Sequence, residues 1–77
     1  MSALEQAVLG VLLEHHPGLL SVAEVVRHIA PDPIDFADRD NVLVAIRELV
    51  QRGLAHRLDG FVFASAAAAY FERLESA

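Results

Sequence analysis

The chain has 77 residues, a formal net charge of −5 and no cysteine, so it is long enough for one domain and excludes disulfide or thiolate–zinc stabilisation. Its longest apolar stretch, Ala7 to Leu13, is far too short to span a bilayer, and Glu5 stands where a signal peptide would carry positive charge. We therefore expect one cytoplasmic domain over residues 1–77, held together by packing. The acidic balance does not favour a polyanion as ligand.

The first predicted element is a helix that begins after Ser2 and ends near His15. Ser2 and Glu5 have the spacing of a capping box, in which each side chain satisfies a free backbone N–H of the first turn. Leu9 and Leu13 form a second apolar ridge on the opposite side from the main one, next to Gly10, so this helix needs two apolar neighbours. The main ridge consists of Leu4, Val8, Val11 and Leu12.

A second helix follows a short break in the chain. Pro17–Gly18 ends the first helix, and Leu19–Leu20 is a short extended piece that could pair as a strand. Ser21 and Glu24 form another capping box, and two prolines stop the helix near Ala30. Its expected buried residues are Val22, Val25, Val26 and Ile29.

Residues 31–37 are predicted to be a turn-rich loop in which Ile34 and Phe36 anchor the chain in the core. A third helix is then expected to begin near Asp38, whose side chain can cap it, and to end before Gly53. Its core arc comprises Val42, Ala45, Ile46, Leu49 and Val50. Its outward face comprises Asp40, Val44, Arg47, Glu48 and Gln51.

A β-hairpin and a last helix complete the chain. Asp59–Gly60 is a two-residue type I′ turn signal between strands at residues 54–58 and 61–64. Ser65 is expected to cap a helix from Ala66 to about Glu75. One side of that helix carries Ala67, Tyr70, Phe71 and Leu74.

The fold class is therefore mainly α with a small β-hairpin, in the order helix, strand, helix, helix, strand, strand, helix. The segment from Asn41 to Leu54 resembles the recognition helix and wing entry of bacterial winged-helix regulators, including the DNA-binding half of ferric-uptake-type repressors. Leu49, Gly53 and Leu54 carry most of this likeness, and residues 21–26 resemble the first helix of a helix-turn-helix. The resemblance implies a helix-turn-helix over about 21–53, a wing over about 54–64 and a C-terminal helix over about 65–76.

The resemblance implies a transcription regulator whose third helix enters the major groove of double-stranded DNA. Asp38, Asp40 and Glu48 lie in the same neighbourhood and Asp59 is at the wing tip, so the affinity of a single copy should be low. The candidate DNA contacts are Arg27, Arg39, Asn41, Val44, Arg47, Gln51 and Arg57.

The alternative is a winged helix that binds a protein partner and has little DNA affinity. The candidate dimer or helix-packing residues are Leu9, Leu13, Tyr70, Phe71 and Leu74. Two arrangements remain open for them: a seam between two copies, or a last helix that folds back onto Leu9 and Leu13 of its own chain.

Other chemistry is not expected. The four histidines lack a zinc-ligand spacing, and the aspartates between residues 32 and 40 do not match a calcium loop. There is no phosphate loop, nucleophile elbow or framed carboxylate pair, so we expect no enzyme, metal, cofactor or small-molecule substrate. Glu72 and Glu75 give the last helix the wrong charge for an anionic membrane surface.

Overall fold

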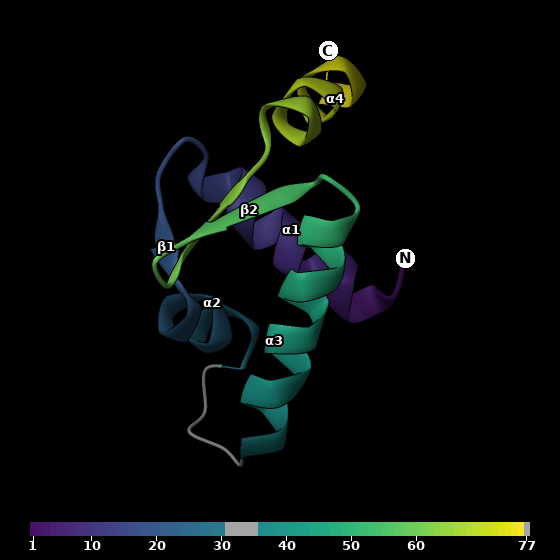
Figure 1. Ribbon diagram of the computed structural model, residues 1–77. Helices are drawn as coiled ribbons and strands as arrows, with labels where there is room; N and C mark the ends of the chain where they lie inside the picture. The colour runs from purple at the N-terminus through teal and green to yellow at the C-terminus, as the bar shows by residue number, and fades with distance from the viewer. Residues whose placement is uncertain (31–35, 77) are drawn as a thin grey trace.

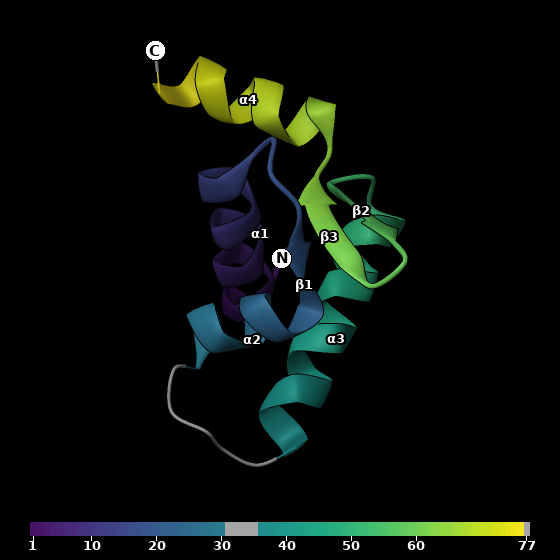
Figure 2. The same ribbon diagram turned by 90° about the vertical axis from the view of Figure 1, so that its left-hand side faces the viewer.

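The computed structural model describes residues 1–30 and 36–76 and is mainly helical, with a small antiparallel sheet (Figure 1). The order of its elements is the predicted one. They are α1 (Ala3–His15), β1 (Leu20–Ser21), α2 (Val22–Ile29), α3 (Phe36–Gln51), β2 (Ala55–Leu58), β3 (Phe61–Ala64) and α4 (Ala66–Ser76). In both views α4 lies at the opposite end of the molecule from the first turns of α3 (Figures 1 and 2).

The sheet has the strand order β1-β3-β2, with both pairings antiparallel. The two-residue β1 pairs Leu20 with Val62, so the predicted short strand closes the sheet beside the hairpin. Asp59 and Gly60 both have positive φ, 51° and 85°, as a type I′ turn requires. The hairpin prediction is therefore confirmed.

The core lies where α1, α2 and α3 meet the sheet. Val8 and Leu12 of α1 and Val25 of α2 are almost fully buried. The sheet closes the core with Val62 and Ala64. From α3, the core receives Val42, Ala45, Ile46 and Leu49.

Both predicted capping boxes are present. Ser2 Oγ accepts from the Glu5 N–H at 3.1 Å, and Glu5 Oε1 accepts from the Ser2 N–H at 2.9 Å. Ser21 and Glu24 make the same reciprocal pair, with both bonds at 3.1 Å. Ser65 Oγ accepts from the Ala68 N–H at 3.1 Å, which confirms the predicted cap of α4.

Helix α3 ends as predicted and begins earlier than predicted. Gly53, at φ 76°, donates to the Val50 carbonyl and Leu54 donates to the Leu49 carbonyl, which is the Schellman pattern. The helix starts at Phe36, so Asp38 lies in its first turn and does not precede it as a cap. An aspartate is favourable both as a cap and within the first turn of a helix. The residue type of Asp38 therefore could not decide between these two positions. The predicted anchors, Ile34 and the Phe36 side chain, lie outside the described residues.

The face of α3 that reaches the core is narrower than predicted. Val50 was expected in the core arc, but it is 37% exposed. It lies at the margin of the buried stripe, where the chain leaves α3 through Gly53 and turns into β2. The prediction for Val50 was therefore wrong.

Helix α4 packs on the body through small residues. Ala68 and Ala69 are buried, whereas Tyr70, Phe71 and Leu74 are 55%, 62% and 54% exposed. Helix α4 therefore lies back beside Leu9 and Leu13 through its alanines, while Tyr70, Phe71 and Leu74 of the predicted apolar side face solvent. The cap at Ser65 begins the helix directly after β3, and the alanines are the residues that face inward.

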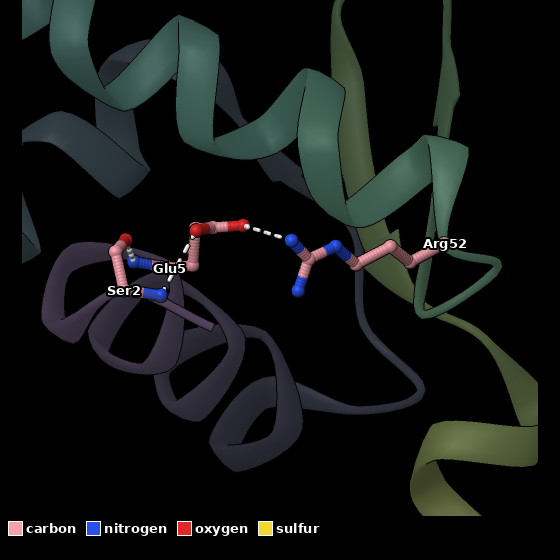
Figure 3. A network of polar contacts seen from close by, with 3 residues as sticks. All are labelled: Ser2, Glu5 and Arg52. Atoms are coloured by element: carbon pink, nitrogen blue, oxygen red, sulfur yellow. Dashed lines mark hydrogen bonds and ion pairs between the residues drawn. The ribbon is translucent and has the colours of Figure 1, made fainter.

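A buried carboxylate joins the start of α1 to the end of α3 (Figure 3). Glu5 is 9% exposed, and its Oε2 lies 3.9 Å from Nη2 of Arg52. The hydrogen bonds with Ser2, and secondarily the charge of Arg52, hold the pKa of Glu5 below its ordinary value. The Glu5 side chain thus caps α1 and also contacts Arg52, the residue that follows α3.

We predict that Glu24→Gln flattens the acid side of the stability profile. Hydrogen bonds with the backbone N–H and side chain of Ser21 lower the pKa of Glu24 from 4.5. Because the pKa is lower in the folded state, the stabilisation is present above pH 4.5 and is lost as the pH falls through the folded-state pKa. Glutamine keeps a capping-box side chain but does not titrate. Urea unfolding followed by circular dichroism should show a smaller loss of stability on acidification than in the parent. Glu14→Gln is the control, and an equal flattening by that variant would contradict the assignment.

We predict opposite effects from alanine at two exposed glycines. Gly53→Ala should lower the free energy of unfolding by about 1–2 kcal/mol, because its φ of 76° is left-handed. Gly10→Ala should raise it by roughly 0.5–1 kcal/mol, because Gly10 lies inside α1 and an added Cβ meets no atom within 4 Å. Thermal melts of the two variants beside the parent decide this. A melting temperature of Gly53→Ala at or above that of the parent would refute the C-cap analysis, and a lower melting temperature for Gly10→Ala would refute the analysis of α1.

Candidate nucleic-acid interface

The outer face of α3 presents the side chains that the sequence predicts as contacts. Its orientation is fixed from the inside, because Ile46 and Leu49 are fully buried on the opposite face. The candidate contacts that are exposed on this helix are Arg39, Asn41, Val44, Arg47 and Gln51, and the acidic Asp40 is exposed among them. They extend over about 18 Å of helix, at 1.5 Å per residue.

A hollow of about 350 Å³ lies where this face meets β2. Arg57 of β2 and Arg47 and Gln51 of α3 supply its polar groups. Val44, which is 47% exposed, is part of its apolar wall. The other lining residues are Leu43, Ile46 and Val50. The fold thus brings Val44, Arg47, Gln51 and Arg57 together, although Arg57 comes from a different element.

The remaining candidates lie apart from this hollow. Arg39 and Asn41 are exposed on the first half of α3 and do not line it. Arg27 lies on α2, where it lines a separate hollow of about 200 Å³ with Glu24 and His28. The charge of Arg27 contributes to the lowered pKa of Glu24, after the hydrogen bonds with Ser21. Arg27 is therefore already partly matched by a carboxylate.

The arginines on α3 and β2 are available to an anionic ligand. Within residues 1–30 and 36–76 the ion pair closer than 4 Å is that of Arg52 with Glu5, so Arg39, Arg47 and Arg57 have none there. An exposed guanidinium without a partner can make bidentate contacts to phosphate or carboxylate. The carboxylates of the same region are Asp38, Asp40, Glu48 and Asp59.

Leu43 and Val50 line the hollow between α3 and β2, although the sequence did not indicate that they belong to this face. Leu43, Arg47 and Val50 are spaced i, i+4 and i+7, which is the spacing of one helix ridge. This spacing is visible in the sequence, but it does not show that β2 lies beside the ridge and leaves Val50 partly exposed. The position of the strand is needed for that.

Within the described part of the chain, no group of three or more histidine, cysteine or acidic side chains could hold a metal ion. His15 and His28 contact each other edge to face, with ring centroids 4.9 Å apart, and His15 Nδ1 lies 3.0 Å from the Val11 carbonyl oxygen. No helix among these residues combines the length and apolar character needed to cross a bilayer. The aspartates at 32 and 35 lie outside the described residues.

Comparison of the chain with protein-family models, with curated proteins and with solved structures finds no match.

Proposed function

We propose that the chain is a winged helix-turn-helix module that binds double-stranded DNA, with the role of a transcription regulator of the bacterial type. The observation that carries the proposal is the position of Arg47 and Arg57. Both are exposed, neither has an ion pair in the part of the chain that the structure describes, and they share one hollow between a helix and the adjacent strand. The order of elements and the sheet order β1-β3-β2 are consistent with this assignment.

The outer face of α3 carries side chains suited to reading a major groove. Asn41 and Gln51 can make paired hydrogen bonds with adenine, and Val44 can contact the methyl group of thymine. Arg57, on the strand that would form the wing, is suited to a phosphate of the neighbouring backbone. The residue types thus supply both positioning and base contacts.

The charge of the molecule limits the affinity of one copy. The chain carries 11 acidic and 6 basic residues, and the acidic residues near α3 oppose the arginines there. Each phosphate neutralised contributes about −0.9 to the slope of log K against log salt. A shallow slope, corresponding to few phosphates, is therefore expected for the monomer.

We predict measurable binding of a labelled random-sequence duplex at about 50 mM salt that weakens at about 200 mM, because competing counterions oppose phosphate contacts. Arg47→Ala or Arg57→Ala should lower the affinity and reduce the salt slope by about 1 each, one phosphate contact being lost. Fluorescence anisotropy measures both quantities.

Ala7→Glu is the matched control for this titration. It also makes the net charge one unit more negative, but Ala7 is exposed on α1, away from the hollow. It should retain nearly all of the parent affinity. Absence of duplex binding by the parent at low salt would contradict the proposal. Equal losses of affinity in all three variants would show that only the net charge of the chain matters.

The second candidate function is association with a protein through the same hollow. The observation that favours it is the apolar lining by Leu43, Val44 and Val50, since exposed apolar patches rimmed by polar groups mark protein-binding sites. The two arginines at the hollow would then pair with carboxylates. The matching ligand is an amphipathic segment with an apolar anchor flanked by acidic residues.

We predict that Val44→Lys separates the two candidates. It adds a positive charge and removes part of the apolar wall, so duplex affinity should rise several-fold if DNA is the ligand. Under the protein candidate, the substitution should weaken binding of a labelled helical peptide with leucines at i, i+3 and i+4 and flanking glutamates. Val44→Ala, which removes the apolar contact without adding charge, is the control. No rise in duplex affinity with Val44→Lys would count against the DNA assignment.

A further inference from the structure

We propose that the exposed face of α4, with the hollow beside it, is the interface between two copies of this chain. The face carries Tyr70, Phe71 and Leu74, each more than half exposed. It does not overlap the hollow between α3 and β2. The dimer proposal is therefore independent of whether the chain binds DNA.

An apolar hollow adjoins the exposed face of α4. A hollow of about 350 Å³ runs between α1 and α4. Leu9, Leu13 and Leu54 give it apolar walls, and Phe71 lies at its margin while remaining 62% exposed. Met1, Ala68, Glu72 and Glu75 complete the lining. The hollow lies on the Glu75 side of the α4 face, so it forms one rim of the surface that a second copy would cover.

The margins of the α4 face carry opposite charges. Arg73 and Glu75 are two residues apart, hence about 200° apart around the helix, and the apolar stripe of Phe71 and Leu74 lies between them. A two-fold axis along the helix would bring Arg73 next to the partner's Glu75. The charge pattern is thus complementary to itself, whereas a partner of one charge sign would meet repulsion on one margin.

The exposed area suits a weak dimer. A buried tyrosine or phenylalanine covers about 150–250 Å², so Tyr70 and Phe71 leave roughly 100 Å² each open. With Leu74 and Met1, which are also about half exposed, the face offers roughly 400 Å² per copy. Two copies would bury roughly 800 Å², the size of a small, transient interface.

The weak attachment of α4 to its own body is consistent with a covering partner. Its buried contacts are those of Ala68 and Ala69, which offer little area. Isolated helices shorter than about 12–15 residues are marginal in water, and α4 has 11 residues. A second copy would cover the large side chains that the alanines leave outside.

The oligomeric state tests the proposal directly. Sedimentation equilibrium of the full chain should give the mass of a dimer at about 100 µM, above the micromolar dissociation constants typical of small interfaces. Phe71→Glu should weaken dimerisation by at least about tenfold, as loss of a central aromatic anchor does. Ala7→Glu, with the same change of charge on the other side of α1, should leave it unchanged.

Folding and packing effects are separated by two further measurements. Phe71 is exposed in the single chain, so Phe71→Glu should retain the parent's circular dichroism spectrum. Since the chain has no cysteine, Leu74→Cys introduces a single thiol at the seam. It should form a disulfide-linked dimer on mild oxidation much faster than Ala7→Cys. A monomeric parent at this concentration, or equal cross-linking of both thiols, would overturn the proposal.

Discussion

Packing of α3 against α1, α2 and the sheet is the constraint on which the rest of the structure depends. Val42, Ile46 and Leu49 are essentially inaccessible to solvent, and they fill the space between Val8 and Leu12 of α1 and the inner face of the hairpin. A helix held along one side by fully buried branched residues cannot rotate without opening a cavity. The opposite side is therefore presented to solvent in one fixed orientation.

Both ends of the segment that contains α3 are tied to neighbouring elements. At the C-terminal end the Schellman pattern at Gly53 directs the chain into β2, which places Arg57 beside Arg47. Arg52, in the same turn, reaches the carboxylate of Glu5 at the start of α1 (Figure 3). Arg52, directly before the glycine at which the helix ends, thus also contacts α1. The hollow between α3 and β2 follows from the tight turn at Gly53, which brings the strand beside the helix.

The parts of the fold that the sequence predicts well are those specified by local chemistry. The capping boxes at Ser2 and Ser21 and the turn at Asp59–Gly60 need no knowledge of distant residues, since the interacting groups lie within three positions. The candidate contacts on α3 were predictable in the same way, because helical periodicity separates its two faces.

The sequence leaves open, or misplaces, features that depend on how distant elements pack against one another. Periodicity places Tyr70, Phe71 and Leu74 on one side of α4, but whether that side is buried depends on the angle at which the helix leaves β3. Val50 lies at the edge of the buried stripe of α3, and this place alone distinguishes it from the core residues. How exposed it is depends on how closely β2 lies beside it. The start of α3 was misplaced because Asp38 suits the first turn as well as a cap.

A domain of this size cannot cover all the apolar residues that it carries. Hydrophobic residues make up 55% of the chain, and at about this length only about 60% of the unfolded surface is buried on folding. In the described part of the chain, some of this surplus lies at two places with different margins: arginines border the hollow between α3 and β2, whereas Glu72 and Glu75 line the hollow beside α4. Phosphate is attracted to the first and repelled from the second. Two such surfaces allow one copy to contact an anionic ligand and a second copy at the same time, and pairing of copies would double the arginines that one ligand meets.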